Sequence, residues 1–171
     1  MELTRARAIA EELKSQLEPA CERIEIAGSI RRQKPFVGDI ELLCVPKIDN
    51  GADCLDQAIK LFMQFGVLSM RLNKRGSRAY GPKNKLLVHL PSGMGLDIFS
   101  TDEKCWPVAL VARTGGKVTN QRIAMAAIKK GWHLQAYGAG FSTPEGDIVC
   151  KSEKEVFELV GLPYKDPWER D

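Results

Sequence analysis

The sequence predicts an α+β protein with two lobes, and three patterns support this fold class. Residues 1–105 begin with a helical repeat of apolar residues and continue with short strands that alternate polar and apolar side chains. Residues 106–171 contain two helical segments, a glycine-rich hairpin and a capped helix. The boundary near residue 105 rests on this change of pattern, since no repeat or low-complexity linker separates the halves.

Length and composition favour a folded intracellular protein. The 171 residues suit one compact unit with a small appended lobe, and an apolar content of 44% can form a real core. A net charge of +3 permits a nucleic-acid partner without requiring one. We expect no membrane partner and no secretion, because no apolar run has spanning length and no signal segment opens the chain. The five scattered cysteines are typical of reduced thiols.

The first lobe is expected to place helices against a sheet. Its predicted elements are a helix over 3–17, strands over 23–27 and 39–46, a helix over 55–65, and strands over 67–72, 85–90 and 96–100. Pro19 ends the first helix and Gly66 the second. The apolar stripe of the second helix is predicted to be buried as far as Phe65.

The second lobe is expected to be smaller and mixed. Its predicted elements are helices over 106–113 and 119–130, a hairpin over 132–141, and a helix that begins after residue 152. Ser152 and Glu155 have the spacing of a capping box, in which each side chain accepts a hydrogen bond from a backbone N–H of the first turn.

Three carboxylates stand on strands that are otherwise apolar. Asp39 and Glu41 are two residues apart and therefore share one face of their strand, and Asp97 lies on a later strand. Taken alone, such acids are usually a solvated face. If the two strands are neighbours, three acids together are costly unless cations lie between them. Two divalent metal ions would neutralise them, bridge a triphosphate and activate an attacking hydroxyl.

The stretch before these acids has residues suited to phosphate. Gly28 allows a close backbone approach and Ser29 offers a hydroxyl, although Gly-Ser is most often a simple turn. Arg31 and Arg32 supply guanidinium groups that can bind phosphate oxygens in pairs. Gly38 lets the chain pass the metal ions without a side chain. In combination with the acids, these residues predict nucleotidyl transfer.

A basic segment over 71–85 is a candidate contact for a nucleic-acid backbone. It contains Lys74, Arg75 and Arg78, and its alternative interpretation is a solvated hairpin end. Competing motifs are incomplete: Gly115-Gly116-Lys117-Val118 lacks the spaced glycine and the Ser or Thr of a P-loop. Gly138-Ala139-Gly140 does not continue as a dinucleotide-binding fingerprint.

Gly28-Ser29, followed by Asp39-x-Glu41 and later by Asp97, resembles the nucleotidyltransferase superfamily of DNA polymerase beta. More specific segments resemble the family X polymerases in the same order: Gly-Ser-Ile-Arg-Arg at 28–32, Leu-Asp-Ile-Phe at 96–99, Thr114-Gly115 with Asn120, and the segments 132–138, 152–157 and 164–170. The resemblance implies a nucleotidyltransferase palm, a mixed β-sheet flanked by helices, with a small α+β lobe. It further suggests a minimal catalytic core without the amino-terminal lyase domain.

The resemblance also implies roles for individual residues. Asp39, Glu41 and Asp97 would bind two Mg2+ ions, for which Mn2+ can substitute, and Asp97 would accept the proton of the primer 3′-hydroxyl. The other implied roles are triphosphate binding for Ser29, Arg32 and Gly38, sugar contacts for Thr114, Gly115 and Gly116, a minor-groove contact for Asn120, and DNA contacts for Lys117 and Arg122 beside the basic segment.

Three positions depart from the family pattern. Glu41 stands where these polymerases usually have Asp, and its extra methylene changes the reach of the carboxylate. Ala112-Arg113 replaces an aromatic pair that helps to exclude ribose, which predicts weak sugar discrimination. Ala124 stands at the position of an arginine that checks the new base pair, which predicts low fidelity.

The expected function is template-directed DNA synthesis from dNTPs on primer-template or gapped DNA, in short-gap repair, by a monomer. Two alternatives stay open at this point. One is a nucleotidyltransferase of another class, which adds nucleotides without a template or modifies RNA, protein or a small molecule. The other is a non-catalytic nucleic-acid-binding module that kept the fold.

Overall fold

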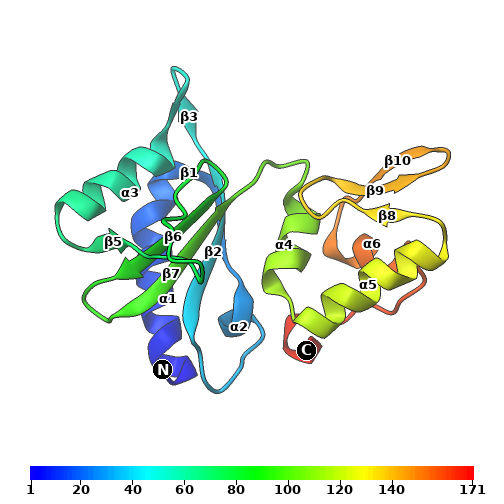
Figure 1. Ribbon diagram of the computed structural model, residues 1–171, viewed down its shortest axis with the longest axis horizontal. Coiled ribbons are helices and arrows are strands. Elements are labelled where there is room, and N and C mark those ends of the chain that lie inside the picture. Colours follow the sequence, from blue (N-terminus) through cyan, green and yellow to red (C-terminus); the bar gives the residue numbers. More distant parts are fainter.

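The computed structural model describes residues 1–171 and confirms the α+β class, with a mixed sheet flanked by helices (Figure 1). The first part of the chain contains α1 (Leu3–Leu17), a 3₁₀ turn (Glu18–Ala20), β1 (Cys21–Ile26), α2 (Gly28–Arg31), β2 (Asp39–Pro46), β3 (Ile48–Asp49), β4 (Ala52–Asp53), α3 (Cys54–Gln64), β5 (Leu68–Met70), β6 (Asn84–His89) and β7 (Met94–Ser100). The rest contains α4 (Trp106–Thr114), α5 (Lys117–Lys129), β8 (His133–Leu134), β9 (Gly140–Thr143), β10 (Gly146–Val149), α6 (Glu153–Glu158) and a 3₁₀ turn (Pro167–Glu169).

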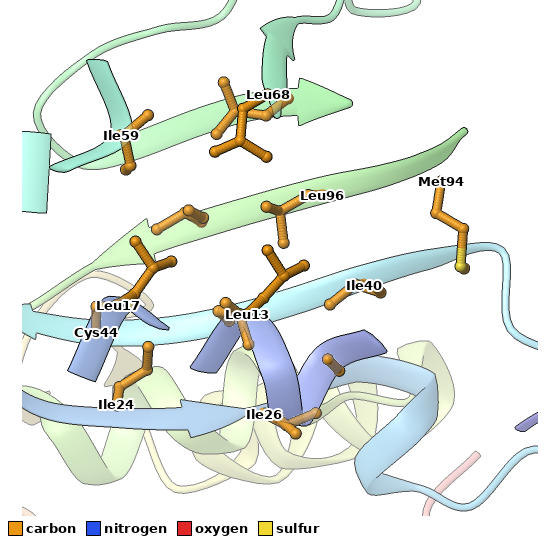
Figure 2. Close-up of a cluster of buried hydrophobic side chains, with 14 of the residues drawn as sticks. Leu13, Leu17, Ile24, Ile26, Ile40, Cys44, Ile59, Leu68, Met94 and Leu96 are labelled. Carbon is orange, nitrogen blue, oxygen red and sulfur yellow. The ribbon is translucent and has the colours of Figure 1, made fainter. Parts of the chain in front are cut away.

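The central sheet has the strand order β1-β2-β7-β6-β5, and only the β2–β7 pair is parallel. Helices α1 and α3 cover one face. Leu13 and Leu17 of α1 lie in the largest apolar core together with Ile24, Ile40 and Leu96 of the sheet (Figure 2). Period-two alternation puts the even-numbered residues of β2 into this core, so its odd-numbered residues face the opposite side.

The opposite face of the sheet is divided along its length. Leu43 and Val45 of β2 and Phe99 of β7 form a small core with Trp106 and Leu110 of α4. The start of β2, where Asp39 and Glu41 lie, stays outside this core. Helix α4 also packs into the core of the second lobe, through Val108 and Val111. Since α4 contributes to the cores of both lobes, the domain boundary at residue 105 stays a prediction.

The second lobe packs α4, α5 and α6 around Phe141 and Phe157, both fully buried. Its sheet has three strands, β10-β9-β8, where only a hairpin was expected. The third strand was missed because most of its side chains are exposed, and it therefore lacks an apolar alternation. The Ser152 side chain accepts a hydrogen bond from Glu155 N as predicted, while Glu155 accepts from Lys151 N, one residue before the cap.

Two local predictions need correction. Phe65 is 74% exposed, because α3 ends at Gln64 and the chain turns there, so the side chain leaves the buried stripe. Helix α5 begins at Lys117, two residues before the predicted start. All five cysteines are free thiols, and no helix combines the length and apolarity that crossing a membrane requires.

Candidate active site

The strand register brings the three predicted acids together on one face of the sheet. Strands β2 and β7 run parallel, with Glu41 opposite Asp97 and Asp39 opposite Gly95. The condition for the metal-binding interpretation, that the two acid-bearing strands are neighbours, is thereby met. Since Glu41 and Asp97 are paired in register, all three carboxylates lie within two residues of one point along the strands.

Burial makes two of these carboxylates difficult to ionise. The pKa of Glu41 is raised to about 7, first by burial and then by the negative charges of Asp39 and Asp97. Burial likewise raises the pKa of Asp97, against the opposing influence of the Arg71 guanidinium. The side chain of Asp39 is about half exposed. The site therefore carries more negative charge than its own surroundings stabilise.

Arg71 is a site residue that the sequence did not single out. Its guanidinium donates Nη2–H to Asp97 Oδ1, and its Nη1 lies 3.4 Å from Asp39 Oδ2. Arg71 follows β5, at the far edge of the sheet from β2. It belonged to the predicted basic segment, and no local pattern separates it from its neighbours there.

Glu41 is directed toward the turn that leads into α2. A Cβ atom added to Gly28 would lie 1.5 Å from Glu41 Oε2, and Gly28 has a φ of +59°, so both space and backbone require glycine. The three carboxylates thus share a face without converging, and no group of three or more metal-ligating side chains is assembled as it stands. Their oxygen chemistry nevertheless suits Mg2+, and the raised pKa values mark a place where a cation would be stabilising.

The two predicted phosphate-binding arginines both reach the second lobe. Arg31 donates to Thr114 Oγ1 at 2.7 Å and binds both carboxylate oxygens of Glu153, at 2.7 and 2.9 Å. Arg170, completely buried, donates to the same carboxylate at 2.9 Å. This differs from the predicted phosphate contact of Arg31, because its guanidinium is occupied by a carboxylate 122 residues away in sequence.

Arg32 keeps one buried donor nitrogen without a partner. It donates to the Thr114 carbonyl through Nη1, while its Nε is buried without a hydrogen-bond partner. Such an orphaned buried donor suits an acceptor brought by a ligand, and a phosphate oxygen is of that kind. Ser29 is half-buried on α2 nearby, and Gly38 is exposed, with nothing within 4 Å of an added Cβ. The steric reason expected for Gly38 is therefore not visible here.

The segment predicted to hold the sugar connects α4 to α5. Thr114, Gly115 and Gly116 are all buried, and a Cβ added to Gly115 would lie 2.9 Å from Arg32 Nη1. Asn120, predicted to reach a base, instead donates its Nδ2–H to Ala112 O at 2.9 Å, which leaves Oδ1 buried and unpartnered. Because the Nδ2 amide carries a second hydrogen, this bond leaves the predicted contact with a base open, and that contact stays a prediction.

Arg113 is a second site residue that the sequence did not predict. Its only signal in the sequence is that Ala112-Arg113 replaces an aromatic pair. Its Cζ lies 3.7 Å from the ring centre of Phe99 and 5.8 Å from that of Tyr137. Its positive charge lowers the pKa of Glu41 and of Asp97 against the stronger effects of burial. With these two rings, Arg113 lines a cavity of about 280 Å3 between the two lobes.

The predicted DNA-binding residues are exposed on two separate elements. Lys74, Arg75 and Arg78 lie in the loop between β5 and β6, and Lys117 and Arg122 lie on α5. Lys85 also belongs to the basic segment, but the predicted contact with a nucleic-acid backbone is wrong for this residue. It is 2% exposed, donates to Gly81 O at 2.8 Å and lies 4.0 Å from Asp56, so it anchors the loop from inside.

Each comparison with known proteins finds similarity to a DNA polymerase. A family model described as the DNA polymerase beta thumb matches residues 109–171. DNA polymerase lambda of Rattus norvegicus is 28% identical over 160 residues, which cover 84% of this chain and 28% of the relative. The chain thus spans little more than a quarter of that curated relative.

Solved structures extend the likeness to the whole chain. Polymerase beta of Leishmania infantum, solved as a ternary gap complex, matches with a TM-score of 0.82 and 22% identity, covering 100% of this chain and 70% of that one. The same polymerase in a ternary P/T complex matches with a TM-score of 0.78 and 22% identity, over 100% of this chain and 76% of that one. These matches show that both lobes have the polymerase beta fold.

Proposed function

We propose that this chain, which is related to the family X DNA polymerases, transfers a deoxynucleotidyl group from a dNTP to a primer 3′-hydroxyl under the direction of a template. The observation that carries this proposal is the register of β2 and β7, which sets Glu41 beside Asp97 on the face that also bears Asp39. A non-catalytic binding module would have no need for a cluster of three acids in which burial opposes the ionisation of two, Glu41 and Asp97.

Divalent cations are the implied cofactor, and Asp39, Glu41 and Asp97 are the residues that would hold them. We propose two Mg2+ ions, with Mn2+ as a substitute. Such ions, when bound, stabilise charge on the triphosphate and lower the pKa of the attacking hydroxyl. The fit rests on the donor set and on the uncompensated negative charge of the site, which favours a cation.

The remaining chemistry belongs to residues of the chain itself. Asp97, with its raised pKa, is suited to accept the proton of the primer hydroxyl. The free Nε–H of Arg32 and the hydroxyl of Ser29 would orient the triphosphate. Thr114, Gly115 and Gly116 would border the sugar, where Arg113 stands in place of an aromatic side chain. We therefore propose weak discrimination between dNTPs and NTPs, and low fidelity because Ala124 supplies no arginine.

Gapped or primed DNA is the proposed substrate, and filling of short gaps is the proposed use. One structural relative was solved as a ternary gap complex and also as a ternary P/T complex. The exposed cations of the loop (Lys74, Arg75 and Arg78) and of α5 (Lys117 and Arg122) lie on two different lobes. Two basic groups so arranged could contact phosphates on both sides of a primed site.

Primer extension on a one-nucleotide gap tests the proposal. Each dNTP is supplied alone against each template base, in Mg2+ and in Mn2+, beside an Asp97→Ala variant. We expect incorporation of the complementary nucleotide and none by the variant. Incorporation that ignores the template base would identify a nucleotidyltransferase of another class, and activity that survives in Asp97→Ala would remove these acids from the reaction.

A further inference from the structure

Arg71 reaches the acidic residues from across the sheet. Its backbone N–H donates to Leu86 O of β6, and Leu86 lies opposite Asp97 in the β6–β7 register. The side chain then extends over β6 to β7 and β2, where the guanidinium contacts both Asp97 and Asp39. One cation thus bridges two of the three carboxylates, while Glu41 has no part in the contact.

The sheet has an open side-chain position where this guanidinium lies. Gly95 stands opposite Asp39 on the same face, and a Cβ atom added there would be 2.2 Å from Arg71 Nη1 and 3.1 Å from its Cζ. Even an alanine would therefore exclude the guanidinium from its present place. The contact thus depends on two separate features of the sequence, an arginine after β5 and a glycine within β7.

The neighbouring cations of the same loop make no such contact. Lys74 and Arg75 are exposed and form no ion pair, whereas the Arg71 side chain is 29% exposed and forms two. Only Arg71 therefore competes for the carboxylate oxygens that a divalent cation would use. A guanidinium and a metal ion cannot occupy the same oxygens, because both carry positive charge and both need direct contact.

We propose that Arg71 is a built-in counter-ion of the acidic site, which holds Asp39 and Asp97 until a divalent cation enters and must leave them when it does. The inference rests on the proposed function only in taking these acids as the cation site. Arg71 acts through the acids and is a positioning residue. It keeps the carboxylates stable and correctly placed without a metal, at the cost of weaker cation binding.

The released guanidinium stays beside the exposed cations of the loop, because Arg71 lies only a few residues before Lys74, Arg75 and Arg78 in the chain. There it is available to a phosphate group of the nucleic acid. An anion that binds only the released guanidinium will tighten cation binding at the acids. The cation will tighten binding of that anion by the same factor, because both require Arg71 to leave the acids. Cation binding and DNA binding are thereby coupled.

Titration calorimetry with Mn2+, on the full chain without DNA or nucleotide, tests the proposal directly. We expect Arg71→Gln to bind Mn2+ about tenfold more tightly than the wild type, as befits the loss of one competing charge at a partly buried site. Gly95→Ala, which keeps the arginine but fills its place, should bind about threefold more tightly on the same grounds. The matched control Arg75→Gln should stay within about twofold of the wild type, since an exposed charge is screened.

The outcomes separate this inference from the proposed function. Unchanged affinity in both variants, or no Mn2+ binding by any protein, overturns the role of Arg71. If Arg71→Gln does not fold, Gly95→Ala decides alone, because it retains every charge. Tighter binding in the variants together with a wild type that never extends a primer would uphold the counter-ion and reject the polymerase. Primer extension by the wild type, together with unchanged Mn2+ affinity in both variants, would uphold the polymerase and reject the counter-ion.

Discussion

Strand β2 presents opposite kinds of residue on its two faces over the same few positions. Ile40 and Leu42 are completely buried against α1 and α3, in the largest core of the molecule. Asp39 and Glu41 alternate with them and face the other side, where Asp97 joins them from β7. One face follows the usual rule for a sheet covered by helices, and the other carries charge that burial makes costly.

This contrast shows how a stable sheet can hold an unfavourable site. The apolar face contributes the burial that drives folding. The charged face is held by contacts that come from elsewhere in the chain: Arg71 from beyond β5, and α2, which is tied to the second lobe through Arg31 and Glu153. The two faces should accordingly respond to mutation in different observables, activity for one and stability for the other.

Glu41→Gln should give the largest effect and leave stability nearly intact. We expect nucleotide incorporation to fall by a factor on the order of a hundred to a thousand, because a metal ligand contributes several kcal/mol to the transition state. The melting temperature should stay or rise, because an acid whose ionisation is opposed by burial is removed. Single-nucleotide incorporation and calorimetry measure the two quantities.

The matched control for that variant is Glu22→Gln, an exposed glutamate of β1 outside the site. It should change neither quantity. A Glu41→Gln protein with wild-type incorporation would mean that the charged face has no part in the reaction.

Leu42→Ala, at the very next residue, should show the converse behaviour. Removal of a fully buried leucine should lower the free energy of unfolding by about 3 kcal/mol, through lost burial and the cavity left behind. Incorporation per folded molecule, assayed well below the melting temperature, should remain within about twofold, since the acids stay in place. Denaturant unfolding measures the loss, and a collapse of activity at full folding would show that the two faces are not independent.

Glu153→Gln should test the connection between the lobes. The pKa of Glu153 is lowered, despite burial, by Arg31 and Arg170. The ionised form is therefore stabilised on folding, and this stabilisation is complete above the unfolded pKa of about 4.3 and lost as pH falls through the folded value. At pH 7 the variant should be about 2 kcal/mol less stable, because two partly or fully buried arginines lose their partner.

The stability difference between wild type and Glu153→Gln should then shrink as pH is lowered below the unfolded reference of about 4.3 and through the depressed folded pKa of Glu153. Thermal unfolding across that range provides the measurement. Glu158→Gln is a suitable control, since Glu158 pairs only with exposed Lys154. A stability difference between wild type and Glu153→Gln that stays constant as pH falls would show that the ion pair contributes no pH-dependent stability.

Neutralising the loop cations should give the smallest of these effects. Lys74, Arg75 and Arg78, replaced together by Gln, should weaken DNA binding about tenfold near 0.1 M salt, because released counter-ions drive the binding of phosphates. The slope of log affinity against log salt should fall by about 0.9 for each DNA phosphate that the loop no longer neutralises. Fluorescence anisotropy at several salt concentrations measures both, and an unaltered slope would exclude this loop from the interface.

Local patterns predicted most of the fold because its elements carry their own signals. The apolar period over residues 3–17, the alternation over 39–46 and the glycine and proline breaks are properties of neighbouring residues, and the structure places α1 and β2 at those bounds. The weak strand at 146–149 was missed because three of its four residues are exposed and no apolar alternation marks it. Where burial does not impose a period, the sequence holds no signal to find.

The sequence by itself determined which residues share a face: two-residue spacing sets Asp39 with Glu41, and no tertiary contact is needed for that. Only the tertiary structure decided which charges meet. Arg71 and Arg75 belong to one basic segment, yet the register of β5, β6 and β7 and the open position at Gly95 bring Arg71 alone to the acids. Arg31 likewise meets Glu153 only because the second lobe folds back on α2. Pairing of charges depends on distances between segments remote in sequence, and no local pattern records them.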